Sequence, residues 1–296
     1  MVTGIGDDCA VLRLPKGHEV LVTTDFSLEG IHFRRDWHPP EVVGRRCLTR
    51  GLSDIAAMGG QPRAAFLSLA LDAKVPQSWV DRFLEGLLQA AKEFSVPLAG
   101  GDTAQSARGI QADIVVVGSV PRGRAIRRSG ARPGDSIYVT GELGGSAAAL
   151  AHLRRGKVRP DDFERHFCPA ARIEIGSFLR RHRLASAMID LSDGLSTDLA
   201  HICEESGVGA EIGAMAIPRA RVGHHAKTVS LDLALHGGED YELLFTSRKR
   251  IPRRIAGVPV TNIGSITMGS HTVLLNDQGK TRELRIRGWE HFRRAP

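Results

Sequence analysis

The stretch PEVVGRRCLTRGLSDIAAMGGQPRAAFLSLAL, residues 40–71, joins a helical pattern to a strand pattern. From Pro40 the apolar residues return at helical intervals until Gly59 and Gly60, which are typical of a helix end. The segment AFLSLAL (65–71) then predicts a buried strand. A helix that leads directly into a strand indicates a mixed α/β fold.

Three more strand patterns and one more helix pattern surround this stretch. The strands are VLVTTDF (20–26), VPLAGGDT (96–103) and ADIVVVGSV (112–120). We expect the first to end at Thr23-Thr24-Asp25 and the second to break at two glycines before Asp102. A strongly periodic helix is predicted from Ser78, with Asp81 at the capping-box position.

The second half of the chain follows a basic, turn-rich segment, RSGARPGD (128–135), which we expect to be a hinge. The elements predicted beyond it are a strand (136–141), two helices (144–153 and 171–182), a strand (186–190), a helix that begins near Ser192 and Asp193, and a glycine turn with a strand (235–246). NDQGKT (276–281) predicts a hairpin turn. We therefore expect two α/β domains, residues 1–127 and 128–296.

Composition narrows the class of protein. The 296 residues have an ordinary globular balance and a net charge of +7, but the excess charge gathers in short runs such as RRHR (180–183). These runs resemble solvated faces, so we expect no nucleic-acid partner. The four cysteines are far apart, which suits a reduced, cytoplasmic protein. No apolar run approaches the ~20 residues of a membrane span, and no signal peptide opens the chain.

Aspartates recur beside glycine, serine or threonine where a predicted element ends. The five places are Asp7-Asp8 in GIGDDCAVL (4–12), Thr23-Thr24-Asp25, Ser53-Asp54, Gly100-Gly101-Asp102, and Asp190-Leu191-Ser192-Asp193. Each alone is typical of a cap or a turn. Together they favour a site where strand ends gather and cations separate the like charges. Oxygen ligands without a Cys or His cluster favour Mg²⁺, which takes further ligands from substrate phosphates.

The familiar phosphate-binding motifs are absent. Gly279-Lys280-Thr281 ends like a P-loop, but the preceding residues do not match. GIGDDC (4–9) fails the dinucleotide-binding pattern at its last position, and its acids would repel a phosphate unless a metal ion intervened. Among the histidines we retain His32 as a candidate, because it follows the Asp25 cluster.

The ordered set of motifs resembles the thiamine-monophosphate kinases, a family in the superfamily of aminoimidazole ribonucleotide synthetase. The matching stretches, in order, are GIGDDCAVL, VTTDFSLEGIHF, GLSDIAAMGGQPRAAFLSLAL, LAGGDT, GRAIRRSGARPGD, IDLSDGLSTDL, GGEDYELLF and GWEHF. The resemblance implies transfer of a phosphoryl group from ATP to thiamine monophosphate with several Mg²⁺ ions. It also implies an α/β N-terminal domain with a mixed sheet that forms a homodimer through its strands, a second α/β domain, and a site in the cleft between them.

The resemblance also implies roles for individual residues. Those that match metal ligands are Asp8, Thr23, Thr24, Asp25, Asp54, Asp102, Asp190 and Asp193. The ATP contacts are Gly101, Asp102, Arg128 and Ser192, and the thiamine contacts are His32, Glu239 and Trp289. We expect catalysis to depend on Asp25, Asp54, Asp102, Asp193 and Arg128. Asp7 is interpreted as a turn-forming or outer neighbour of Asp8.

Several alternatives remain open. Without the resemblance, Arg128 could be an ion-pair former at the hinge, Glu239 a turn acid and Trp289 a core anchor. Within the superfamily, a formyl-glycinamidine cyclase or a selenide-activating enzyme shares the aspartate, metal and ATP core. A basic nucleic-acid-binding protein is the alternative from another class. Family members usually carry about twenty more residues before the first motif, and we expect their absence to weaken site closure or dimer support.

Overall fold

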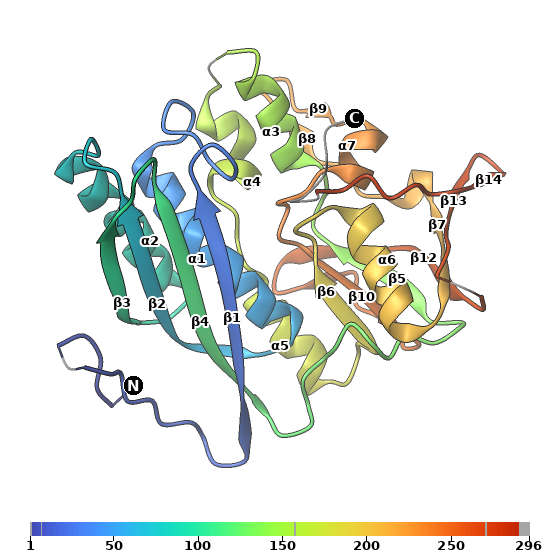
Figure 1. The fold of residues 1–296 in the computed structure, drawn as a ribbon. Coiled ribbons are helices and arrows are strands. Elements are labelled where there is room, and N and C mark those ends of the chain that lie inside the picture. The colour runs from blue at the N-terminus through green and yellow to red at the C-terminus, as the bar shows by residue number, and fades with distance from the viewer. Residues whose placement is uncertain (1, 7, 157, 270, 290–296) are drawn as a thin grey trace. The chain divides into compact units, whose positions relative to one another are not determined.

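The computed structural model describes residues 2–6, 8–156, 158–269 and 271–289. The chain divides into two compact units (Figure 1). Unit 1 comprises Met1–Ala125 together with Phe167–Ile173, and unit 2 comprises Ile126–His166 together with Glu174–Pro296. The chain is a mixed α/β protein, as predicted. The separate roles assigned to residues 1–127 and 128–296 stay predictions.

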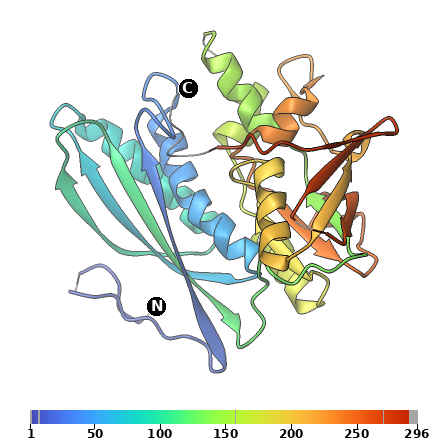
Figure 2. The same cartoon turned by 45° about the vertical axis from the view of Figure 1, so that its right-hand side comes forward.

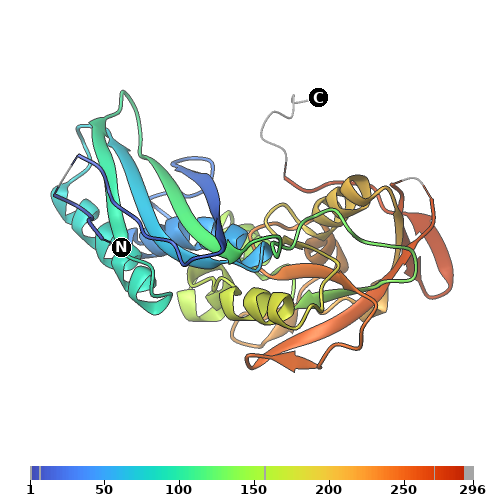
Figure 3. The ribbon, with the colours of Figure 1, turned by 90° about the horizontal axis from the view of Figure 1, so that it is seen from below.

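Unit 1 is a four-stranded sheet with two helices on one face (Figures 1 and 3). The strand order is β1-β4-β2-β3, and only β3 runs parallel to its neighbour. The strands are β1 (His18–Leu28), β2 (Gln61–Leu71), β3 (Leu98–Gln105) and β4 (Gln111–Pro121), and the helices are α1 (Pro40–Ala57) and α2 (Gln77–Glu93). The quoted stretch thus forms α1 and β2, as its pattern predicts.

Two predicted strand ends are wrong. β1 pairs with β4 over eleven residues, from His18 to Leu28, so Thr23-Thr24-Asp25 lies inside the strand. β3 continues through Asp102, because Gly101 fits tightly against β2, where a Cβ would overlap the Leu67 carbonyl oxygen. In both places hydrogen bonding to a distant strand continues the extended backbone past the polar residues.

The predicted start of α2 also differs slightly. The helix begins at Gln77, its N-cap is Pro76, and that cap makes no side-chain hydrogen bond. Asp81 accepts a hydrogen bond from Gln77 Nε2 at 2.8 Å. The Ser78–Asp81 capping box is therefore wrong, although the helix and its apolar face are as predicted.

Helices α1 and α2 approach each other backbone to backbone. A Cβ on Gly44 would overlap the Phe83 carbonyl oxygen, and a Cβ on Gly86 would overlap the Glu41 carbonyl oxygen. Each helix therefore has a glycine where the other helix comes closest. Both helices also bury apolar side chains, such as Leu48 of α1 and Phe83 of α2.

Unit 2 contains an eight-stranded sheet whose main path is β14-β13-β7-β12-β5-β10-β6, with β11 paired to β12 outside that path. Its strands are β5 (Ser136–Thr140), β6 (Ala187–Asp190), β7 (Gly209–Gly213), β10 (Leu243–Ser247), β11 (Arg254–Ile255), β12 (Val258–Thr267), β13 (Val273–Asp277) and β14 (Lys280–Glu283). A separate ribbon is formed by β8 (Arg221–Val222) and β9 (Lys227–Thr228). Among the paired strands of this sheet that the structure describes, the β13–β7 pair alone is parallel.

The remaining helices are α3 (Gly145–Leu153), α4 (Glu164–Phe167), α5 (Ile173–Arg181), α6 (Leu195–Ser206) and α7 (Leu231–His236), with 3₁₀ turns η1 (Pro160–Phe163) and η2 (Ala214–Ala216). Helix α6 packs against β6, β7, β10 and β13 (Figure 2). The hairpin predicted at NDQGKT is confirmed, because β13 and β14 are joined through Gln278 and Gly279, both with positive φ. No helix in the described ranges has the length and apolar character needed to cross a membrane.

A buried carboxylate holds the start of α3. Asp240 accepts hydrogen bonds from the backbone N–H groups of Gly144, at 2.6 Å, and Ser146, at 3.3 Å. Burial raises the pKa of Asp240 to about 7, against the lowering effect of these two hydrogen bonds. Burial thus favours the protonated form of the Asp240 carboxyl.

We expect Gly86→Ala to lower the free energy of unfolding by about 3 kcal/mol, because the added methyl group would force α1 and α2 apart. Alanine is about 1 kcal/mol more favourable than glycine inside a helix, so intrinsic propensity would change stability in the opposite direction. Urea unfolding measures the difference, with Gln89→Ala on the exposed face of α2 as the control. A Gly86→Ala variant as stable as the control would contradict this packing.

The raised pKa of Asp240 predicts a pH dependence of stability. As pH rises from about 4 to about 7, the folded state holds a proton at this carboxyl that the unfolded state releases, so this group's contribution to stability is lost. Over this pH range, the contribution of Asp240 to the free energy of unfolding falls by about 4 kcal/mol. We expect urea unfolding of Asp240→Asn to show a shallower loss of stability over this range than wild type, with the exposed Asp161→Asn as the control. Equal pH profiles for Asp240→Asn and wild type would contradict the assignment.

Candidate active site

In unit 1, β1 and the last turn of α1 bring three candidate residues together. The Thr23 hydroxyl donates a hydrogen bond to Asp54 Oδ2. Asp25 lies two residues further along β1, and side chains at that spacing share a face of the sheet. The charge of Asp25 also contributes to the pKa of the buried Cys47 thiol on α1, which burial raises to about 12. Thr23, Asp25 and Asp54 thus form an oxygen-rich group between the sheet and α1.

The opposite face of the same sheet carries Thr24 and Asp102. Thr24 donates a hydrogen bond of 2.6 Å to Asp113 on β4. Strand register places Asp113 opposite Ser68, and Ser68 opposite Asp102. Asp102 and Asp113 line a small groove of about 120 Å³ together with the half-exposed Phe26.

This arrangement corrects the expectation that the unit 1 carboxylates converge from strand ends. The residues lie inside strands, and successive side chains of a strand point to opposite faces. The sheet therefore separates Thr24 and Asp102 from Thr23 and Asp25. Asp113 was not predicted; the one signal for it is a charged residue inside an otherwise apolar strand pattern. The metal and ATP roles of Gly101 and Asp102 stay predictions.

The N-terminal carboxylate Asp8 precedes the sheet of unit 1. It lies in an exposed turn between Thr3 and Val11, whose backbones form a bridge with an N–O distance of 2.9 Å from Val11 to Thr3. Asp7 lies outside the described residues. The role of Asp8 as a metal ligand stays a prediction.

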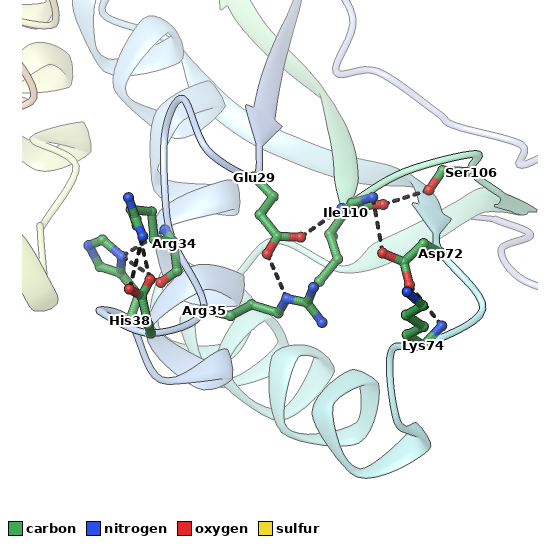
Figure 4. Close-up of polar contacts among 10 residues, drawn as sticks. Glu29, Arg34, Arg35, His38, Asp72, Lys74, Ser106 and Ile110 are labelled. Atoms are coloured by element: carbon green, nitrogen blue, oxygen red, sulfur yellow. Dashed lines mark hydrogen bonds and ion pairs between the residues drawn. The ribbon is translucent and has the colours of Figure 1, made fainter.

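His32 lies in the loop after β1, with a defined tautomer. The Leu28 N–H donates to His32 Nδ1 at 3.0 Å, so Nδ1 is an acceptor and the neutral ring carries its proton on Nε2. The loop is anchored through Glu29, which accepts hydrogen bonds from Arg35 Nε at 2.6 Å and from Ile110 N at 3.1 Å (Figure 4). His32 can therefore present an N–H donor from a fixed loop.

The turn at Gly109 and Ile110, which donates a hydrogen bond to Glu29, is itself held by hydrogen bonds (Figure 4). Asp72 accepts from the N–H groups of Lys74, at 2.7 Å, and Gly109, at 3.0 Å. These two hydrogen bonds lower the pKa of Asp72. The Ser106 hydroxyl donates to the Gly109 carbonyl at 2.5 Å.

In unit 2, three carboxylates crowd the turn between β6 and α6. Asp190 ends β6, and Asp198 in the first turn of α6 accepts from the N–H groups of Asp193, at 3.2 Å, and Gly194, at 3.0 Å. Burial raises the pKa of Asp198, and the charges of Asp190 and Asp193 raise it further. The three carboxylates therefore oppose one another, and a cation beside them would lower their energy. Asp198 was missed in the sequence, where it is an unremarked acid within the first helical turn.

Two residues that the resemblance assigns to the thiamine substrate meet this same turn. The Glu239 N–H donates to the Ser192 carbonyl at 2.8 Å, and the Trp289 N–H donates to the Asp193 carbonyl at 3.2 Å. Trp289 is 50% exposed, so it is not the core anchor considered above. The structure therefore brings Ser192, Asp193, Glu239 and Trp289 together from three distant parts of the sequence.

Arg128 lies elsewhere in unit 2. Its carbonyl oxygen accepts a hydrogen bond of 3.2 Å from Ser206 Oγ, at the last residue of α6, whereas Asp193 precedes the first residue. A helix of twelve residues spans about 18 Å, so the Arg128 backbone is distant from the acidic turn. Its side chain is exposed, and its ATP role stays a prediction.

The donor sets in both units suit a hard cation, since they consist of carboxylate and hydroxyl oxygens without cysteine or histidine. Within the described part of the chain, no three His, Cys, Asp or Glu side chains are already placed as a complete metal-binding group. Any bound ion would therefore need ligands beyond one preformed protein cluster, such as water or substrate oxygens.

Comparison with known proteins gives the context of these sites. Family models described as "AIR synthase related protein" match the N-terminal domain over residues 6–120 and the C-terminal domain over residues 132–275. The thiamine-monophosphate kinase of Salmonella typhimurium is 39% identical over 305 residues, which cover 98% of this chain and 92% of that protein.

Solved structures give the same match. The crystal structure of thiamine-monophosphate kinase from Stenotrophomonas maltophilia K279a has a TM-score of 0.81 and 33% identity, covering 94% of this chain and 90% of that one. AaThiL complexed with AMPPCP and TMP has a TM-score of 0.80 and 32% identity, covering 95% and 89%. The sequence identity, which extends over nearly the full length, and the shared fold together place this chain in the thiamine-monophosphate kinase family.

Proposed function

We propose that this protein transfers the γ-phosphoryl group of ATP to thiamine monophosphate, giving thiamine diphosphate and ADP. The observation that carries the proposal is the meeting of Glu239 and Trp289 with the acidic turn at Ser192 and Asp193, in a chain of this family. In one small region of unit 2, Glu239 supplies a carboxylate and Trp289 an aromatic ring for the cationic thiamine. The carboxylates of the neighbouring acidic turn are proposed to bind the metal ions that contact the phosphates.

The reaction needs no dedicated general base. A phosphate monoester has a second pKa near ~6, so an oxygen of thiamine monophosphate is already ionised at neutral pH. That oxygen forms a bond to the γ-phosphorus of ATP, while the bond between the γ-phosphorus and the β,γ-bridging oxygen breaks and its electron pair leaves with ADP. The main barrier is repulsion between the two anionic substrates, so positioning and charge neutralisation carry the catalysis.

In unit 1, Thr23, Asp25 and Asp54 are the residues proposed to hold one Mg²⁺ ion. Asp8, Thr24 and Asp102 are proposed as ligands of further ions, since the sheet separates Thr24 and Asp102 from the first group. Magnesium ions, when bound, neutralise charge on the transferring phosphoryl group and on the leaving phosphate. The hydrogen bond from Thr23 holds one oxygen of Asp54 in place. His32 is proposed to donate from Nε2 to the thiamine substrate, because its Nδ1 is already occupied.

In unit 2, Asp190 and Asp193 are the proposed metal ligands, and Asp198 positions the turn that carries Asp193 through its hydrogen bonds. Glu239 is proposed to face the positive charge of the thiazolium ring, and Trp289 to stack on an aromatic ring of the substrate. The ATP contacts proposed for this unit are Ser192 and Arg128.

We also propose that the chain acts as a cytoplasmic homodimer. The face of the unit 1 sheet that carries no helix exposes Val20, Val22 and Phe26 by more than half. Three exposed apolar side chains on one strand face favour burial against a second sheet. A second copy of this chain is the occupant that the family resemblance suggests.

The test of the proposed reaction is a coupled assay of ADP release with and without thiamine monophosphate. We expect release to require thiamine monophosphate, and Asp25→Asn and Asp193→Asn each to reduce the rate by about 100-fold or more, since each removes a charged phosphate-side ligand. Asp81→Asn, on an exposed helix face, is the matched control and should keep wild-type activity. Equal ADP release without thiamine monophosphate would favour another ATP-dependent enzyme of the superfamily, and full activity in both site variants would contradict the site.

The role of Glu239 predicts a selective change in substrate affinity. We expect Glu239→Gln to raise KM for thiamine monophosphate by about tenfold and to leave KM for ATP unchanged, because only the thiamine ring carries the opposing positive charge. Steady-state kinetics with each substrate varied in turn measure the split. Glu204→Gln, exposed on α6, provides the control. An equal rise in both KM values would indicate a general structural role for Glu239.

A further inference from the structure

A cavity in unit 2 is lined by three arginines and a histidine, together with two acidic residues and three leucines. It has a volume of about 630 Å³ and lies between α7 and the chain from the end of β14 to Arg287. Pockets of this size hold small organic ligands in proteins. The residues on its wall are Leu231, Asp232, Leu235, His236, Arg282, Glu283, Leu284, Arg285 and Arg287.

Two of its arginines are available for an anion. Neither Arg282 nor Arg285 makes an ion pair or a side-chain hydrogen bond to another residue of the described ranges. Within the part of the chain that the structure describes, Arg287 forms an ion pair with Asp232 alone, at 4.0 Å, and both side chains are more than half exposed. Such a long, solvent-exposed ion pair is weak, so the Arg287 guanidinium can still attract an anionic ligand.

His236 on the cavity wall is held in place and lies within the electrostatic influence of two of the arginines. Burial lowers the pKa of His236, and the charges of Arg287 and Arg282 lower it further, against the raising effect of Asp232. The Nδ1 atom of His236 lies 2.9 Å from Ser196 Oγ on α6, so the ring is held in place. A neutral, oriented imidazole beside guanidinium groups can hydrogen-bond an anionic oxygen without competing for its charge.

The cavity also has an apolar part. Leu235 and Leu284 are buried, and the Leu284 N–H bonds to the Val273 carbonyl at 2.8 Å, which ties the wall to β13. Leu231 adds to this surface from the first residue of α7. Guanidinium groups beside leucines match a ligand with an anionic end and an apolar body.

We propose that this cavity binds a small organic phosphate without a metal ion. The carboxylate turn at Asp190, Asp193 and Asp198 would repel such a ligand unless cations were present, whereas the arginine cavity attracts it directly. Binding there is therefore independent of Mg²⁺. Because Arg287 is followed by Gly288 and Trp289, an occupied cavity lies next to the segment that contacts Asp193.

The test uses the full chain, phenyl phosphate and inorganic phosphate as probes, and isothermal titration calorimetry in EDTA at constant ionic strength. We expect wild type to bind phenyl phosphate more tightly than inorganic phosphate, because only the former has a body for the leucines. The double variant Arg282→Ala, Arg285→Ala should weaken phenyl phosphate binding by at least about tenfold, since charge-assisted hydrogen bonds are lost. Arg253→Ala, an exposed arginine of the same unit, and Asp193→Asn should bind as wild type does.

Absence of phenyl phosphate binding in EDTA, or equal binding by wild type and the double variant, would overturn the proposal. Equal affinity for phenyl phosphate and inorganic phosphate would overturn the proposal that the cavity prefers an organic phosphate. If circular dichroism shows that the double variant is unfolded, Arg285→Ala alone replaces it, and binding equal to wild type would again be contrary. The ADP assay on the same samples separates this result from the proposed reaction, because a failed kinase assignment leaves metal-independent binding unchanged.

Discussion

Close contact between backbones, at positions where a side chain cannot fit, assembles the acidic turn of unit 2. A Cβ on Gly238 would overlap the Ser192 carbonyl, and a Cβ on Gly288 would overlap the Thr197 hydroxyl. Gly194 has φ of 116° and is pressed against the backbone of His236. These glycines let two distant segments reach the loop after β6, and the positions of Glu239 and Trp289 follow from that approach.

Charge crowding gives this assembly its chemical character. Three carboxylates lie at the end of β6 and the start of α6. Burial raises the pKa of Asp198, and the charges of the other two raise it further. Such crowding costs stability unless the charges are compensated, which supports the proposal that a cation binds at this turn. In unit 1, by contrast, the Asp54 carboxylate accepts a hydrogen bond from the neutral Thr23 hydroxyl.

Local sequence patterns predicted the elements well, because periodicity and turn residues are short-range signals. The helix and strand of residues 40–71 and the hairpin at Gln278-Gly279 are examples. The limits of β1 and β3 were wrong, since pairing with strands far away in the sequence decides where an extended segment ends. The same cause hid the separation of Asp25 from Asp102 by the sheet. Asp198 was missed because only the folded turn shows which backbone N–H groups donate hydrogen bonds to it.

The reciprocal glycines of α1 and α2 have a consequence for how this sequence can change over time. Asp54 sits ten residues beyond Gly44 on the same helix, so the depth at which α1 lies against α2 also sets where Asp54 meets Thr23. A larger residue at Gly44 or Gly86 would have to be accepted together with a displaced helix axis. We therefore expect Gly44 and Gly86 to be retained together during evolution, because both determine the position of Asp54, which neither glycine contacts.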